Sequence, residues 1–548
     1  MPVHARHSRR HLLWWSVAAL PLAFLGIFFF WPLITVLVRG LWDGGFDWPG
    51  TWAVVVDPRT VDAVLTTAGL ATLGTLGSLA LGIPGAYVLY RLRWRGQATV
   101  RGIASVPFVL PTIVVATAFT ALFGRSGPLG FLGWDQTVWA IALAMVFYNT
   151  SVVLRIVGGT WAALDPRTAD AARTLGANRR QAFTHVTLPA LVPAIASAAS
   201  VVFLFCATAF GIVLVMGGTR INTLETEIWL QVNQFLDMRA AAVLAILQLL
   251  FVIGILAASA WARRRRERVL GTRTVDGTRA AQRRDLALTI PVLTVLGLLM
   301  AAPLFALIER SLRTPDGYSF DYYAALFTDP PAAVLPVSVW QATLNSLTTA
   351  AIAAVVATGL GLIVASLLAR RGRRAAVLDA LVMMPLGVSA VVVGLGMLLT
   401  LNRVVLGVDL RGSWWLVPMA QAVVALPLVV RTLVPPAKAI DPRMKAAART
   451  LGAGPTREWA TVEWPLLRRP FGLALGFAFA ISMGEFGATS FVARPDRPTL
   501  PTAIYRLLGR PGPENIGMAF AAAVLLAVLT ASVMMVSERM RTQIGGDL

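Results

Sequence analysis

One seven-residue stretch occurs twice in this chain, as Ala171-Ala172-Arg173-Thr174-Leu175-Gly176-Ala177 and again as Ala447-Ala448-Arg449-Thr450-Leu451-Gly452-Ala453, an offset of 276 residues. The same offset relates further residues on both sides. These are Asp165-Pro166-Arg167 with Asp441-Pro442-Arg443, Val186 with Val462, Pro189 with Pro465, Phe210-Gly211 with Phe486-Gly487, and Thr223-Leu224 with Thr499-Leu500. An offset that is kept through polar segments indicates a duplication rather than chance similarity of apolar helices. The sequence therefore predicts two homologous halves.

The composition around this repeat requires a membrane. Of the 548 residues, 57% are hydrophobic and 14% are charged, and the mean hydropathy is +0.70. Soluble domains carry about 25% charged residues, so a cytosolic globular protein and a disordered chain are excluded. The net charge of +21 does not indicate a nucleic-acid partner, because so apolar a chain cannot build a polyanion-binding surface. The single cysteine, Cys206, lies in an apolar stretch and has no partner for an intramolecular disulfide.

Twelve stretches are long and apolar enough to cross a bilayer as helices, which takes roughly 20 residues each. They are 13–38, 63–90, 102–123, 137–158, 190–216, 240–262, 286–308, 340–369, 377–401, 413–434, 470–492 and 517–537. The first follows a basic start, but its apolar run is too long for a signal peptide, so we expect it to be retained. Each half then has six spans in one orientation, and the halves are related by an axis along the membrane normal.

The distribution of positive charge predicts the orientation. With the N-terminus inside, the inner segments contain 35 of the 48 Lys and Arg residues and the outer segments contain 13. The positive-inside rule therefore places both termini in the cytoplasm. The predicted halves, 1–262 and 286–548, are joined by a cytoplasmic linker, 263–285, with nine arginines. This linker is either a docking or regulatory site or, as we favour, a segment that fixes topology and contacts anionic membrane lipid.

The repeated stretch lies in the cytoplasmic loop between the fourth and fifth spans of each half. Asp165 and Asp441 are placed as helix N-caps, and a proline follows each at the first helical position, where its missing N–H costs nothing. Gly176 and Gly452 are placed to end these helices. The small alanines between them let another surface approach closely, so each loop suits insertion into a groove of a partner. The alternative is a helical hairpin that only steadies the bundle.

These loops resemble the Glu-Ala-Ala loop of ABC importer permeases, in which a glycine, a hydrophobic residue and Leu-Pro follow at set spacings. The copies here read Asp170-Ala171-Ala172, Gly176, Val186, Leu188-Pro189 and Ala446-Ala447-Ala448, Gly452, Val462, Trp464-Pro465. The resemblance implies an all-α, type I importer fold in a bacterial inner membrane. It also implies that the loops dock two cytoplasmic ATPase subunits, which bind ATP and Mg, and that an extracytoplasmic solute-binding protein delivers the solute. Because Ala446 lacks the acid that Asp170 keeps, we expect the two docking sites to differ.

The chain itself shows no catalytic constellation. A phosphate-binding loop ends in Gly-Lys-Ser/Thr, but the two lysines, Lys438 and Lys445, follow an alanine and a methionine. The four histidines and one cysteine form no metal-ligand pattern. We therefore expect a transport subunit that holds no metal or cofactor, and not an enzyme.

The end of the fifth span in each half carries the candidate pathway residues. With two threonines of the following outer loops, the predicted pathway or gate set is Phe210, Gly211, Thr223, Glu485, Phe486, Gly487 and Thr499. A carboxylate within a membrane is costly and usually faces a cavity or a partner, so Glu485 either lines the pathway or braces the helices with Ser482 or Thr489. The matched Phe210 and Phe486 form either a hydrophobic constriction or ordinary helix contacts.

The fused two-half layout resembles the thiamine and ferric-iron permease group over nearly the whole chain, and residues 483–489 also resemble a signature of molybdate and sulfate permeases. The resemblance implies alternating-access import of a small polar solute, with thiamine or ferric iron favoured, driven by the ATPase partners. The alternative is an ion- or proton-coupled secondary transporter, which also commonly has two six-span halves. That class is expected to show a relay of membrane carboxylates or histidines, whereas Glu485 stands almost alone in the spans.

Overall fold

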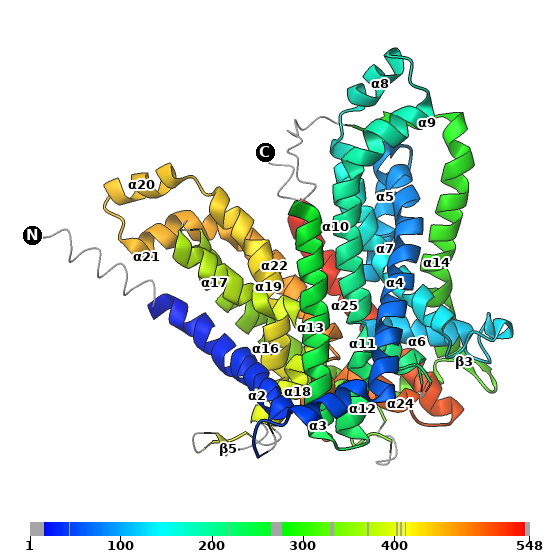
Figure 1. Cartoon of the computed structure of the whole chain (residues 1–548), viewed down its shortest axis with the longest axis vertical. Helices are drawn as coiled ribbons and strands as arrows, with labels where there is room; N and C mark the ends of the chain where they lie inside the picture. Colours follow the sequence, from blue (N-terminus) through cyan, green and yellow to red (C-terminus); the bar gives the residue numbers. More distant parts are fainter. Residues whose placement is uncertain are drawn as a thin grey trace, which may run out of the picture. The chain divides into compact units, whose positions relative to one another are not determined.

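The computed structural model describes residues 16–42, 44–218, 220–264, 277–328, 334–369, 372–401, 404–405, 408–410 and 413–542. Three predictions concern residues outside these ranges, namely the first residues of the first span, most of the arginine-rich linker, and the outermost residues at both ends of the chain. Within the described ranges the protein is almost entirely helical (Figure 1).

Within the described ranges, ten helices are long and apolar enough to span a membrane, and the number rises to twelve if each of two bent helix pairs is one span. The ten are Ser16–Leu41, Pro58–Arg91, Val138–Ala163, Arg179–Ala207, Met238–Ala258, Arg283–Leu312, Val339–Leu368, Leu416–Ala439, Thr456–Gly484 and Pro513–Ser537. The predicted all-α fold with long apolar helices is thereby confirmed.

The predicted spans 102–123 and 377–401 are not straight helices. Their bent pairs are Gln97–Val109 with Thr112–Phe123, at 102°, and Arg373–Gly387 with Ala390–Leu401, at 97°. In the first pair Pro111, which lacks an N–H, is extended, with ψ 141°. In the second pair the Ser389 hydroxyl accepts a hydrogen bond of 3.1 Å from the Val391 N–H, which favours a new helix start. An apolar composition alone does not reveal such bends.

The chain divides into two compact units that do not coincide with the predicted halves. The first unit contains Met1–Thr51, Leu236–Ile246 and Phe320–Leu548, and the second contains Trp52–Phe235 and Leu247–Ser319. The described part of the first span therefore belongs to the unit that holds most of the second half. Likewise the first span of the second half belongs to the unit that holds most of the first half.

The first unit is built around α16, α19 and α22. Its helices, with η for 3₁₀ or π turns, are η1 (Gly26–Phe30), α2 (Trp31–Leu41), α15 (Asp321–Ala325), α16 (Val339–Leu368), α17 (Arg373–Met383), η7 (Met384–Gly387), α18 (Ala390–Leu401), α19 (Leu416–Ala439), α20 (Pro442–Thr450), α21 (Pro455–Glu458), η8 (Trp459–Glu463), α22 (Trp464–Gly484), α23 (Thr489–Val492), α24 (Leu500–Leu508) and α25 (Pro513–Thr542). Helix α2 packs closely on α18, because a Cβ at Gly396 would lie 2.9 Å from the Pro32 carbonyl oxygen. Helices α3 (Trp48–Val56) and α13 (Met238–Arg264) have residues in both units.

The second unit is built around α4, α7 and α10. Its helices are α4 (Pro58–Ala86), η2 (Tyr87–Arg91), α5 (Gln97–Ile103), η3 (Val106–Val109), α6 (Thr112–Phe123), η4 (Gly130–Leu132), α7 (Val138–Ala163), α8 (Pro166–Thr174), α9 (Arg179–Ala182), η5 (Phe183–Thr187), α10 (Leu188–Ala207), α11 (Phe210–Met216), α12 (Leu224–Asn233), η6 (Arg283–Asp285) and α14 (Leu286–Leu312). A Cβ at Gly74 of α4 would lie 2.7 Å from Cys206 Sγ of α10 and 3.2 Å from Met145 Cβ of α7. The three helices therefore approach as closely as a glycine allows.

The strands in the described parts of the chain are each two residues long. They pair as β1 (Leu92–Arg93) with β2 (Arg279–Ala280), β3 (Arg313–Thr314) with β4 (Gly317–Tyr318), and β5 (Val404–Val405) with β6 (Val408–Asp409). The first pair is parallel and the other two are antiparallel. Of these three pairs, β1–β2 joins distant parts of the chain, because it pairs the end of the linker with the residues that follow η2.

Candidate functional site

The first cytoplasmic loop folds as its sequence predicts. The Asp165 carboxylate accepts a hydrogen bond of 2.9 Å from the Arg167 N–H and caps α8. Gly176, with φ +93°, ends that helix in the left-handed region, where a glycine is favoured. Pro189 then lies in the first turn of α10. Helix α8 stands at one end of the long helices of its unit (Figure 1).

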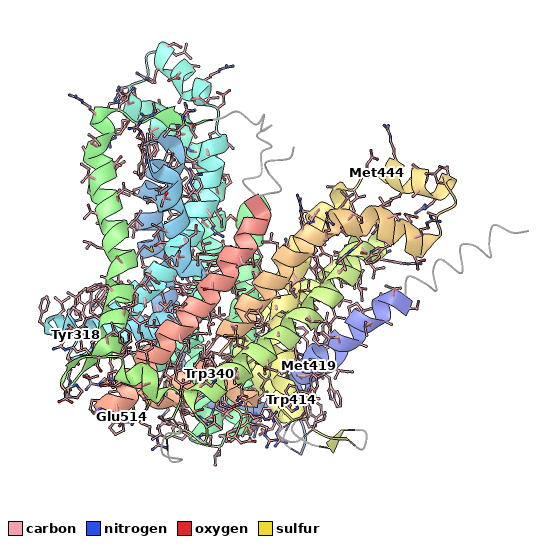
Figure 2. All side chains as sticks on the ribbon, turned by 180° about the vertical axis from the view of Figure 1, so that it is seen from behind. Tyr318, Trp340, Trp414, Met419, Met444 and Glu514 are labelled. Atoms are coloured by element: carbon pink, nitrogen blue, oxygen red, sulfur yellow. The ribbon has the colours of Figure 1, made fainter. Side chains whose placement is uncertain are left out.

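The second loop repeats this construction in the other unit. The Asp441 carboxylate accepts a hydrogen bond of 2.8 Å from the Arg443 N–H and caps α20. Gly452 has φ +79°, and Pro465 lies in the first turn of α22. Figure 2 shows Met444 of α20 at one end of the first unit and Trp414, just before α19, at the other. The alanines of both loops lie on helices that bury none of their own residues.

A leucine stands at the apex of each loop, directly before the helix-ending glycine. Leu175 is 89% exposed and Leu451 is 87% exposed. Neither is among the predicted site residues, although both belong to the repeated stretch. Both copies of the loop therefore expose an apolar side chain at the same position.

The two loops differ in what braces them. In the second, Arg449 donates two hydrogen bonds to the Glu458 carboxylate, at 2.6 and 2.9 Å, and Lys445 donates one of 2.7 Å to Glu463. The Glu458 hydrogen bonds raise the pKa of the Arg449 guanidinium. At the fixed offset, the two glutamates correspond to Ala182 and Thr187 of the first loop. The first loop has instead the exposed Arg173–Asp170 pair at 3.6 Å, a kind of pair that contributes little.

The fifth span of the second half is interrupted, so the predicted span 470–492 is not one helix. Helix α22 ends at Gly484 and α23 begins at Thr489. The Glu485 carboxylate accepts hydrogen bonds from the Ala488 N–H at 2.7 Å, from the Thr489 N–H at 3.0 Å and from the Thr489 hydroxyl. Of the two bracing partners proposed for it, Thr489 is confirmed, whereas Ser482 Oγ is buried without a hydrogen-bond partner in the described structure. Glu485 therefore caps the break in its own helix.

The fifth span of the first half breaks at the matching place, so the predicted span 190–216 is also two helices, α10 and α11. Ala209 stands where the second half has Glu485. Polar groups from other helices reach this break instead. Gln248 Nε2 of α13 lies 3.4 Å from the Ala207 carbonyl oxygen and 3.2 Å from Glu225 Oε1 of α12.

Two buried carboxylates of α12 are absent from the predicted set. Glu225 is 1% exposed and Glu227 is 3% exposed. Glu227 accepts a hydrogen bond of 3.0 Å from Gln231 Nε2. Both flank Thr226 of the repeated Thr-Leu-x-Thr motif. They fall in a predicted outer loop, where the sequence does not indicate which side chains are buried.

The repeated Thr-Leu-x-Thr motifs build the same joint in both units. Thr223 and Thr499 are the N-cap residues of α12 and α24. The N–H of the following leucine donates to a hydroxyl of the second span in each half, at 2.9 Å to Thr67 and at 2.7 Å to Ser346. These contacts give the threonines a helix-capping position, and their place in a pathway stays a prediction.

The matched phenylalanines are buried, each in its own unit. Phe210, at the start of α11, is 4% exposed, and Phe486 is 2% exposed. The Phe486 ring lies 5.7 Å from the Tyr505 ring of α24. A constriction formed by the two phenylalanines together stays a prediction.

A cavity of about 380 Å³ lies in the first unit, beside the segment that joins α23 to α24. Polar and aromatic side chains dominate its lining, among them Gln341, Asn345, Trp414, Arg494, Asp496 and Arg497. Arg497 lies over the Trp414 ring at 5.9 Å, and Arg494 pairs with Asp496 at 2.7 Å, which lowers the pKa of that carboxyl. At the fixed offset Arg494 and Arg497 correspond to Gly218 and Ile221, so this cavity lining is specific to the second half. No cluster of potential metal ligands occurs among the described residues.

The candidate spans and the duplicated cytoplasmic loops define the class of the protein as a two-half membrane permease. Residues 78–267 and 357–542 match the family described as binding-protein-dependent transport system inner membrane component, and the chain belongs to this family. It is a multi-pass inner-membrane permease subunit of a binding-protein-dependent ABC importer and is not itself catalytic. This membership decides against the alternative of an ion- or proton-coupled secondary transporter.

Known relatives cover most of the chain. The thiamine transport system permease protein ThiP of Brucella suis biovar 1 (strain 1330) is 25% identical over 90% of each chain. The protein of the same name from Escherichia coli (strain K12) is 28% identical over 84% of this chain and 86% of its own. A solved bacterial ABC transporter involved in the import of the acidic polysaccharide alginate matches 48% of this chain and 99% of its own, with 18% identity and a TM-score of 0.41.

Proposed function

We propose that this permease imports thiamine, with two cytoplasmic ATPase subunits docked on its loops and an extracytoplasmic binding protein delivering the solute. The assignment of thiamine as the substrate is supported by similarity, over 84–90% of the chain, to proteins described as thiamine permeases. Ferric iron, which the family resemblance implies as the other favoured solute, is the competing solute in the test.

Docking of the ATPase subunits is supported by the geometry of the loops. Each loop presents one leucine, at least 87% exposed, on a short helix fixed at its start by an aspartate cap. An exposed leucine that becomes buried in a partner's cleft contributes about 1.5–3 kcal/mol to binding. ATP-driven closure of the ATPase subunits would then move the two loops and rock the halves about the axis between them.

The broken fifth spans are proposed as the gate. Their residues are Phe210, Gly211, Glu485, Phe486 and Gly487, followed by the capping residues Thr223 and Thr499. A helix break leaves backbone groups unpaired, and such groups are tolerated at membrane depth only where protein or a water-filled cavity surrounds them. An interrupted helix in both halves therefore suits a place where the pathway opens and closes.

Reconstitution tests this proposal. The chain is placed in proteoliposomes with its native ATPase subunits and binding protein, and uptake of thiamine, ferric ion and molybdate is measured. We expect thiamine uptake that needs ATP and that a protonophore does not affect. Uptake of ferric ion but not of thiamine would contradict thiamine as the substrate. Thiamine uptake without the ATPase subunits would contradict the proposed coupling to ATP hydrolysis.

The cavity lined by Trp414, Arg494 and Arg497 is proposed to face the binding protein. Arg494→Glu with Arg497→Glu should raise the concentration of thiamine-loaded binding protein for half-maximal ATP hydrolysis about tenfold, because reversed charge opposes encounter with an acidic partner surface. The maximal rate should stay unchanged. Arg510→Glu, at an exposed arginine of the same outer segment, is the matched control, and an equal effect of that variant would contradict the assignment.

A further inference from the structure

The end of the linker packs on the base of the first loop. Gly277 donates a backbone hydrogen bond of 2.9 Å to the Ala162 carbonyl oxygen near the end of α7. One guanidinium, that of Arg91, donates both to the Gly277 carbonyl oxygen and, at 3.2 Å, to the Leu164 carbonyl oxygen. Leu164 directly precedes Asp165, the cap of α8. The linker, Arg91 and the start of the first loop are thus joined at one point.

This contact requires a glycine. A Cβ at Gly277 would lie 2.7 Å from the Ala162 carbonyl oxygen and also against the Leu164 carbonyl oxygen and Arg91 Nη1. Two of these neighbours are backbone atoms, which cannot move aside as a flexible side chain can. The fit is therefore a specific docking of the linker rather than a chance approach.

A second series of contacts connects the linker to η5, the turn at the end of the first loop. Arg279 of β2 donates two hydrogen bonds of 2.7 Å to Asp285 and one to the Tyr87 hydroxyl. The Tyr87 ring lies 5.3 Å from the Trp161 ring, which lies 6.3 Å from the Phe183 ring of η5. Asp285 raises the pKa of Arg279, so the pair stays charged at physiological pH. Both ends of the first loop are reached from the linker.

We propose that residues 277–285 form a strap that positions the first loop and replaces the ion pairs that brace the second. The first loop lacks both glutamates of the second, and the strap holds the two ends that those pairs would otherwise fix. The functional part of this inference rests on the proposed coupling role of the loops. Arg279 and Gly277 are positioning residues, because they act through the loop and not on the solute.

Hydrogen exchange in the assembled transporter tests the strap. In Arg279→Ala and in Gly277→Val we expect amides of residues 165–185 to exchange about tenfold faster, since loss of a charged hydrogen-bond set lets the loop open more often. Residues 441–463 should be unchanged. Arg449→Ala should give the reverse pattern, and Arg283→Ala, at an exposed linker arginine, should change neither loop.

Rescue separates positioning from general damage. Arg279→Asp combined with Asp285→Arg restores the ion pair with its ends exchanged, and we expect exchange of the first loop to return to within about twofold of the wild type. If a variant assembles poorly, Arg279→Lys, which keeps one hydrogen bond of the set, should give an intermediate exchange rate. Unchanged exchange of residues 165–185 in both Arg279→Ala and Gly277→Val would overturn the strap.

The thiamine molecules transported per ATP hydrolysed distinguish the strap from the coupling role. Faster exchange with a ratio reduced about threefold or more supports both. Faster exchange with an unchanged ratio supports the strap and counts against the coupling role of the first loop. If exchange of the first loop stays at the wild-type rate while the ratio of thiamine to ATP falls, the strap is overturned and the coupling role is retained.

Discussion

Replacing both apical leucines, Leu175→Asp with Leu451→Asp, should abolish thiamine uptake and release the ATPase subunits from the purified transporter. Each leucine is almost fully exposed, so a charge at its place costs the chain little by itself. Within a partner's cleft each charge would be buried unpaired, and loss of an apolar anchor alone typically costs about 2 kcal/mol or more. Each loss predicts a fall of about thirtyfold in the affinity for the ATPase subunit docked on that loop. Co-purification and uptake in proteoliposomes measure it.

The control for this pair is an equally exposed apolar residue outside the loops. Phe131, 81% exposed, lies on a predicted outer segment, and Phe131→Asp should keep both the ATPase subunits and uptake. The single variants should each weaken ATPase binding. Full uptake by the double variant would show that the apical leucines are not the docking anchors.

Replacing Glu485 by alanine should both destabilise the second half and stop transport. The substitution leaves the Ala488 N–H, the Thr489 N–H and the Thr489 hydroxyl without their acceptor at a site where Glu485 is 7% exposed. Unsatisfied buried donors cost on the order of 3 kcal/mol in total here. We expect a lower melting temperature of the purified chain and thiamine uptake reduced at least about tenfold.

Ser482→Ala is the matched control for Glu485→Ala. Ser482 is also buried, at the end of the same helix, but its hydroxyl has no hydrogen-bond partner among the described residues. Its removal orphans no donor and should leave melting temperature and uptake near the wild type. Glu485→Gln keeps one acceptor oxygen and should fall between the two. Wild-type stability and uptake in Glu485→Ala would contradict the capping role.

The repeat and its caps could be predicted from the sequence because they depend on local chemistry. Aspartate before proline, and glycine ten residues beyond that proline in each loop, specify a short capped helix. The orientation of the spans, with both termini in the cytoplasm, stays a prediction from the charge distribution. Long apolar runs were predicted correctly as membrane helices for the same reason.

The interruptions of the membrane helices and the long-range contacts that hold the loops could not be predicted in this way. Hydropathy does not distinguish a continuous helix from two helices joined at Pro111, or from one that Glu485 interrupts and recaps. The contacts of Arg279 and Gln248 join residues far apart in the sequence. Glu225 is buried by such distant contacts, and no pattern near it in the sequence records them.

Cross-linking tests the coupling of the two loops to the ATPase subunits most directly. The native cysteine, Cys206, is 2% exposed, so Leu175→Cys and Leu451→Cys each supply one reactive thiol. In the assembled, transporting complex, a short bifunctional thiol reagent should join residue 175 and, in the other variant, residue 451 to an ATPase subunit carrying single cysteines along its cleft. Cross-links from both positions are predicted. Thiamine transport by complexes that form no cross-link from either position would contradict the coupling of these loops.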